Sequence, residues 1–129
     1  MIFFFDRSVG IGFPRALRTI KKFPLQVEYH QQHFKMEELD DVWLPEVGKK
    51  DWFVIGQDFS YHKNATELAA IRDYNIGVFY LWGANAPQWD AVRVFAKTYD
   101  KIVEKATTTP RPFVFWVRKD GKIVQQPLP

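Results

Sequence analysis

The sequence contains no cysteine, which excludes disulfide bonds, thiolate nucleophiles, iron–sulfur clusters and every zinc site that uses cysteine. Long apolar runs are absent as well. The longest mostly apolar stretch, residues 76–84, holds nine residues, whereas a membrane-spanning helix needs about 20. The apolar residues 1–5 have no basic lead and stop at Asp6, unlike a secretory signal. These absences predict a cytoplasmic protein with no membrane partner.

Neither sign of charge dominates the chain. The 18 Lys and Arg residues against 15 Asp and Glu residues give a net charge of +3, which permits an anionic partner without indicating a strongly basic binder. What the chain has in abundance is apolar surface, with 47% hydrophobic and 17% aromatic residues. At 129 residues it is long enough for one core and too short for two ordinary domains. We therefore expect residues 1–129 to form a single domain.

Short apolar runs alternate with segments of helical periodicity along the chain. The apolar runs, which are typical of strands buried in a parallel sheet, lie at residues 2–5, 25–29, 52–55 and 78–82. Helical spacing predicts helices at about 13–22, 40–48, 64–73 and 87–103, with a loop over 30–38 and a stiff connector over 107–112. Asp120-Gly121, between residues 113–117 and 122–125, favours a tight hairpin. The pattern predicts an α/β fold with a mainly parallel central sheet, flanking helices and a C-terminal β-hairpin.

Two acidic residues follow predicted strands where those strands end. Asp6 directly follows the first strand, and Asp58 follows the third. Ligands of such sheets bind beyond the carboxyl ends of the strands, so these carboxylates should lie close together if the strands are neighbours. Carboxylates gathered in this way suit Mg²⁺ or Mn²⁺. Asp40 or Asp41, at the start of a short helix, is the expected third carboxylate, and the spacing does not choose between them.

Each of these acids also has a structural interpretation. An aspartate after a strand commonly forms a turn by bonding its own backbone. One of Asp40 and Asp41 is expected to cap the helix that starts there, which leaves the other free to face the site.

Basic and aromatic residues near these acids suit a nucleic-acid backbone and its bases. Arg7 adjoins Asp6, Lys63 follows Asp58, and Arg15 lies on the polar face of the first helix, where an ordinary solvated surface is the alternative. Tyr61, Trp82 and Trp89 are candidates for stacking on unpaired bases. Trp89 begins an amphipathic helix face, so we expect it to pack into the core instead. His30 and His33 are spaced as half of a transition-metal site, for which no third ligand is evident.

Three segments together resemble a known family: residues 5–10 (FDRSVG), 40–48 (DDVWLPEVG) and 52–58 (WFVIGQD). Their order and spacing are similar to those of the PIN-like domains, in particular the VapC-type toxins of toxin–antitoxin systems. The resemblance implies a three-layer PIN-like fold and an Mg²⁺- or Mn²⁺-dependent endoribonuclease that hydrolyses phosphodiester bonds. It also implies an RNA substrate and a cognate antitoxin, and the aromatic surplus leaves room for a homodimer.

The resemblance assigns the metal ligands as well. Asp6 would be the first acid, Asp40 or Asp41 the second and Asp58 the third. The region that usually supplies a fourth acid holds Asn85, which can bind a metal through its amide oxygen, with Asp90 farther along the helix. A catalytically inactive PIN-like module that binds RNA or protein is the main alternative. A receiver-like phosphotransfer domain is a weaker one, because the expected lysine after the last core strand is missing.

Overall fold

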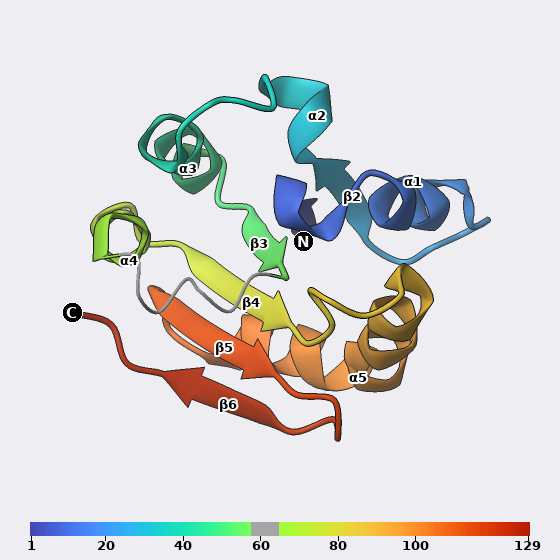
Figure 1. The fold of residues 1–129 in the computed structure, drawn as a ribbon. Coiled ribbons are helices and arrows are strands. Elements are labelled where there is room, and N and C mark those ends of the chain that lie inside the picture. Colours follow the sequence, from blue (N-terminus) through green and yellow to red (C-terminus); the bar gives the residue numbers. More distant parts are fainter. Residues whose placement is uncertain (58–64) are drawn as a thin grey trace.

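The structure is a computed structural model that describes residues 1–57 and 65–129. Strands alternate with helices along the chain (Figure 1). The strands are β1 (Ile2–Phe5), β2 (Gln26–Tyr29), β3 (Phe53–Gly56), β4 (Gly77–Leu81), β5 (Phe113–Val117) and β6 (Ile123–Gln126). The helices are the 3-10 turn η1 (Arg7–Val9), α1 (Gly12–Thr19), α2 (His30–His33), α3 (Asp40–Lys49), α4 (Ala65–Asp73) and α5 (Gln88–Thr108).

The strands form one six-stranded sheet in the order β2-β1-β3-β4-β5-β6. All neighbouring pairs are parallel except β5 and β6, which form the antiparallel C-terminal hairpin. From β1 the chain passes to β2 on one side and then returns to β3 on the other. The direction of the connections therefore reverses between β1 and β3, which is where ligands of open parallel sheets bind.

Helices cover both faces of the sheet, and each face has its own apolar core (Figure 1). Alternate residues of a strand point to opposite faces. Phe3 and Phe5 accordingly pack in the core that α1 and α5 cover, whereas Phe4 packs under α3 and α4. This arrangement confirms the predicted α/β fold with three layers, a mainly parallel sheet and a terminal hairpin.

The helices differ from the prediction at three places, the first being α1, which ends at Thr19 and not near residue 22. Residues 30–33, expected in a loop, form the helical turn α2, with the Gln32 side chain accepting a bond from the Tyr29 N–H at 2.9 Å. Helix α5 continues to Thr108 instead of ending near residue 103. Its last two threonine hydroxyls donate to carbonyls one turn earlier, at 2.8 Å each, so they extend the helix into the expected connector.

Trp89 was expected in the core, and this prediction is wrong. Its side chain is 68% exposed on the first turn of α5. The buried face of that helix begins instead at Ala91 and continues through Val94 and Phe95. Across residues 1–57 and 65–129, no helix has the length and apolar character needed to cross a membrane.

Candidate functional site

Asp6 lies at the point where the connections of the sheet reverse. It directly follows β1, and its N–H donates to the carbonyl of Ile55 on β3 at 2.9 Å, which continues the contact between the two strands. The backbone therefore places Asp6 where it was predicted, at the carboxyl ends of two neighbouring strands. A ligand bound at this edge between β1 and β3 would meet the Asp6 carboxylate.

The Asp6 carboxylate is held in one orientation by Ser8. Its Oδ1 accepts bonds from the Ser8 N–H, at 2.8 Å, and from the Ser8 hydroxyl. The same hydroxyl accepts the N–H of Gln57, at 2.9 Å, and so ties the end of β3 to the turn after β1. Asp6 thus caps η1, as the structural interpretation expected, but both bonds use one oxygen. Its Oδ2 receives no hydrogen bond from any part of the chain that the structure describes, which leaves this atom able to bind a cation.

Burial makes the charge on Asp6 costly. The residue is only 7% exposed. Desolvation raises the pKa of its carboxyl from 3.8 to about 6; the nearby Asp40 adds to the rise, while the Ser8 bonds and Arg7 oppose it. A carboxylate that is buried and close to a second one is stabilised by a nearby positive ion.

Gly56 gives Asp6 the space it occupies. A Cβ atom on Gly56 would lie 2.7 Å from Asp6 Oδ2 and 2.9 Å from Cε1 of Tyr80. Both distances are shorter than real carbon atoms allow, so any larger residue would displace the carboxylate or the ring. Gly56, the last residue of β3, thus leaves the space that the Asp6 carboxylate and the Tyr80 ring occupy.

Of the two candidate acids at the start of α3, the structure brings Asp40 to Asp6. Asp40 Oδ1 accepts from Arg7 Nη2, at 3.2 Å, and from the Trp43 indole N–H, at 3.0 Å. Asp41 is exposed. Consecutive helix residues point about 100° apart, so only one of the two can face inward.

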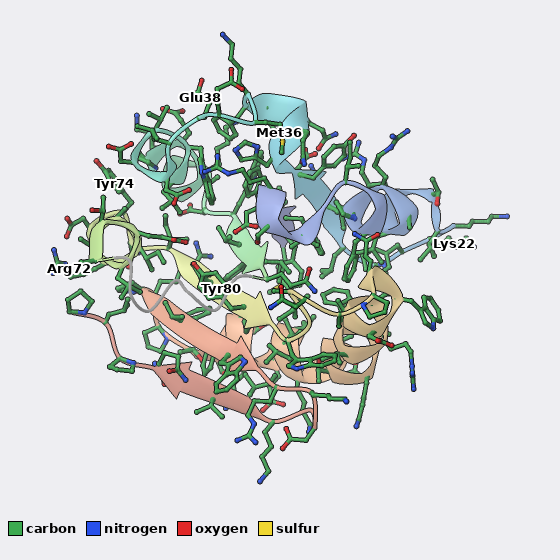
Figure 2. All side chains as sticks on the ribbon, viewed as in Figure 1. Lys22, Met36, Glu38, Arg72, Tyr74 and Tyr80 are labelled. Atoms are coloured by element: carbon green, nitrogen blue, oxygen red, sulfur yellow. The ribbon has the colours of Figure 1, made fainter. Side chains whose placement is uncertain are left out.

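Arg7 connects the turn after β1 with the start of α3. Besides Asp40, it donates to the carbonyl of Glu38, and its Nη1 lies 3.5 Å from His30 Nε2. Figure 2 shows Glu38 beside the connection between α2 and α3. The Arg7 side chain is 30% exposed. Its position therefore serves to hold Asp40, and contact with a substrate phosphate stays a prediction.

The sequence interpretation missed a third carboxylate near this edge, that of Glu67. Glu67 lies in the first turn of α4. Its Oε1 accepts the hydroxyl of Tyr80, a buried residue of β4 that is labelled near the centre of Figure 2. The Tyr80 ring is also the one that adjoins Gly56. The available signal was Tyr80 itself, because a tyrosine in a buried strand needs a polar partner for its hydroxyl.

The other predicted site residues that the structure describes form no hydrogen bond or ion pair with Asp6 or Asp40. Asn85 is exposed in the loop after β4, and Arg15 is exposed on α1. Asp90, on the first turn of α5, lies 3.9 Å from Arg93, with which it forms an ion pair. Asp58, Tyr61 and Lys63 fall outside the described residues, so their roles remain predictions.

The two histidines do not form half of a metal site. His30 is fully buried against the rings of Phe4, Phe34 and Trp43, and burial together with Arg7 lowers its pKa. His33 instead lies near the carboxylate of Glu28, at 3.8 Å.

Asp6 and Asp40 fit a magnesium-type ion as a pair. Mg²⁺ commonly takes only one or two protein carboxylates and completes its shell with water and substrate phosphate. Among the described residues no hydrogen bond reaches Asp6 Oδ2, and the bonds of Asp40 all go to its Oδ1. Within residues 1–57 and 65–129, no group of three Asp, Glu, His or Cys side chains is placed to hold a metal.

The site is thus a pair of carboxylates at the switch point of a three-layer α/β fold. A sequence model described as "PIN like domain" matches residues 1–83, which contain Asp6, Asp40, Gly56 and Glu67. The chain belongs to this family, whose members are nuclease-type modules. Searches of curated proteins and of solved structures gave no match.

Proposed function

We propose that this protein is a metal-dependent endoribonuclease that hydrolyses RNA phosphodiester bonds with Mg²⁺ or Mn²⁺ bound at Asp6 and Asp40. The observation that carries the proposal is the Asp6 carboxylate, which is buried, near Asp40 and, among the described residues, without a hydrogen bond at Oδ2. Membership of the PIN-like family supports the same chemistry. Asp58 is proposed as the third acid and Asn85 as a weaker fourth ligand.

The residues of the chain have separable roles in this proposal. Asp6 and Asp40 hold the ion, which when bound lowers the pKa of a water molecule and offsets charge on the phosphodiester. Ser8 fixes the orientation of Asp6, and Arg7 fixes that of Asp40. Because the pKa of Asp6 is about 6, its carboxylate is available to a cation above that pH.

Substitution of Asp6 tests the proposal. Asp6→Asn should reduce Mn²⁺-dependent cleavage of single-stranded RNA by about 100-fold or more, since even mutations behind a metal ligand cost about 10- to 100-fold. Asp41→Asn is the matched control, because Asp41 neighbours Asp40 but is exposed. It should cleave at the wild-type rate. Retention of full activity in Asp6→Asn would refute the assignment.

One observation supports an alternative, a catalytically inactive PIN-like module that binds RNA or protein. Among the described residues no three carboxylates are placed to share a metal, because Glu67 is bonded to Tyr80, and Arg7 already neutralises Asp40. The alternative predicts that Mg²⁺ and Mn²⁺ leave the melting temperature unchanged and that RNA stays intact. The nuclease predicts a higher melting temperature with either ion, because a ligand that binds only the folded state stabilises it.

We also propose that the nuclease is the toxin of a type II toxin–antitoxin pair, neutralised by a cognate antitoxin. An apolar surface near Asp40 supports this, since Met36, Leu39 and Val42 are each about half exposed or more. Figure 2 shows Met36 on the connection that precedes α3. Induced expression should arrest growth, whereas expression of Asp6→Asn should not. A homodimer through the same surface would instead appear as a doubled mass in solution.

A further inference from the structure

A surface hollow around Trp82, separate from the pair of acids, is lined by an aromatic ring and by cations. Trp82 follows β4 and borders three cavities of about 460, 290 and 500 Å³. The other residues that line the first cavity come from α5 and from the β5–β6 turn, which lie side by side in Figure 1. Trp82 therefore occupies the centre of a hollowed region at the carboxyl edge of the sheet.

Positive charge is in excess in the first of these cavities. Three cations line it, Arg93, Lys97 and Lys119, against one carboxylate, that of Asp90. Asp90 pairs loosely with Arg93, at 3.9 Å. Lys97 and Lys119 form no ion pair with any described residue. The cavity therefore has charge left for an anion.

Each of the two lysines is held close to the cavity. The Lys119 ammonium lies 5.0 Å from the centre of the Trp82 ring, a cation–π contact that covers one face of the indole. The Lys97 side chain lies along the β5–β6 turn, where its Cε is 3.6 Å from the position of a Cβ on Gly121. A lysine has a flexible stem. Lys119 can therefore move from the ring to a phosphate when a base takes its place.

Hydrogen bonds of one residue link Trp82 to the site at Asp6. Gln57, which is buried, donates its N–H to Ser8 at 2.9 Å and its side-chain amide to the carbonyl of Trp82 at 3.5 Å. Neighbouring strands lie about 4.8 Å apart, so the strand that carries Trp82 is about 10 Å from the one that carries Asp6. This separation suits a strand that passes the acids and then reaches Trp82.

We infer that Trp82, with Lys97, Lys119 and Arg93, forms a binding site for single-stranded nucleic acid, in which a base stacks on the indole and the cations contact phosphates. Stacking on an aromatic ring combined with a basic groove is how proteins bind single strands without reading their sequence. The inference deepens the proposed function and rests on it for one point only, that the bound strand continues toward Asp6.

Binding is measured with fluorescein-labelled decauridylate by anisotropy in EDTA, so that cleavage does not contribute. Trp82→Leu should weaken binding about fivefold or more, as loss of one stacked base does. Trp82→Phe should retain most of the affinity. Tyr74→Leu is the matched control, because Tyr74 is an exposed aromatic residue just after α4 that lines none of the three cavities. It should bind like the wild type.

The charge is tested in the same assay. Lys97→Gln should weaken binding about twofold to fivefold and lower the salt dependence by the equivalent of about one phosphate contact. Lys101→Gln, one turn farther along α5 and outside the cavities, should change neither. Calorimetric titration with inorganic polyphosphate should be unaffected by Trp82→Leu, since polyphosphate has no base to stack.

Four results would overturn the inference. They are equal affinity of Trp82→Leu and the wild type for decauridylate, equal weakening of that binding by Tyr74→Leu and Trp82→Leu, a loss of polyphosphate binding in Trp82→Leu as large as its loss of decauridylate binding, and tighter binding of an oligoglutamate peptide than of decauridylate. The last would indicate a protein ligand. Binding that depends on Trp82 in a protein that cleaves no RNA would refute the nuclease and leave this site standing.

Discussion

Asp6 would meet two conflicting demands in the proposed metal site. Its Oδ1 caps η1, which fixes the turn after β1, while the proposed site requires its carboxylate to carry charge. The raised pKa shows that the fold bears a cost for this charge. A position where stability is sacrificed in this way is typical of a functional site.

This cost predicts how stability depends on pH. The Asp6 carboxyl has a pKa of about 6 when folded and 3.8 as its ordinary value, so the folded state binds the proton more tightly. The stability that the protonated group contributes is therefore full below pH 3.8 and is lost as the pH rises to about 6. The difference in unfolding free energy between Asp6→Asn and the wild type should grow by about 3 kcal/mol across this window. Urea denaturation at several pH values measures it, and a constant difference would contradict the prediction.

Gly56 makes a second prediction at the scale of one residue. Gly56→Ala should lower the free energy of unfolding by about 1–3 kcal/mol, as overpacking of a core does. The new Cβ would meet Asp6 Oδ2 and the rigid Tyr80 ring. Gly12→Ala is the control, because its Cβ would meet only the end of the flexible Gln88 side chain. Thermal and urea unfolding of both variants check this, and equal stability of the two would show that the crowding at Gly56 is relieved without cost.

At this scale the sequence predicted the first acid and left the second open. Asp6 was predictable because it ends a continuous apolar run, a purely local pattern. The choice of Asp40 over Asp41 depends on where α3 begins and on Arg7, which lies more than thirty positions away in the chain. Glu67 was missed because it lies on α4 while its partner, Tyr80, lies on β4, and local periodicity does not show which helix residue meets that tyrosine.

At the scale of elements, Arg7 fixes the start of α3 relative to the end of β1. Its guanidinium bonds Asp40 and the Glu38 carbonyl, and it also lies near His30 of α2. Three segments that the chain forms separately are thus held together by one side chain.

Removal of this cation should therefore affect both stability and pH dependence. Arg7→Gln should cost about 1–3 kcal/mol of unfolding free energy, as loss of charged hydrogen bonds does. Arg7 also opposes the rise in the Asp6 pKa, so its loss should move the acidic limb of the cleavage rate to higher pH. Arg15→Gln, an exposed change on α1, is the control and should alter neither property. An unchanged pH profile in Arg7→Gln would show that Arg7 does not act on Asp6.

Helix and strand types were predictable from periodicity, whereas two helix features were not. The turn α2 is too short for a periodic signal and depends on a side-chain bond from Gln32. The extension of α5 depends on threonine hydroxyls that can also bond in non-helical conformations. Trp89 is exposed because the face of α5 that packs on the sheet carries Ala91 and Val94, and Trp89 does not lie on that face.

At the scale of the whole molecule, the family match and the sheet have different extents. The match ends at residue 83, just after β4, whereas the sheet continues through β5 and β6. Along its full length β4 pairs with β5, from Gly77 with Phe113 to Leu81 with Val117. Helix α5 then covers the face of the sheet that holds Phe3, Phe5 and Phe79.

These contacts predict that residues 1–83 do not fold alone. Without residues 84–129, the fragment would leave β4 as an unpaired edge and would expose the apolar face that α5 covers. We expect the fragment to show no cooperative thermal transition by circular dichroism, whereas the full chain melts in one. The comparison also tests the expectation of a single domain, because two independent units would give two transitions. A cooperative melt of the fragment would mean that the matched segment is a folding unit in itself and that α5 and the C-terminal hairpin were added to an already stable core.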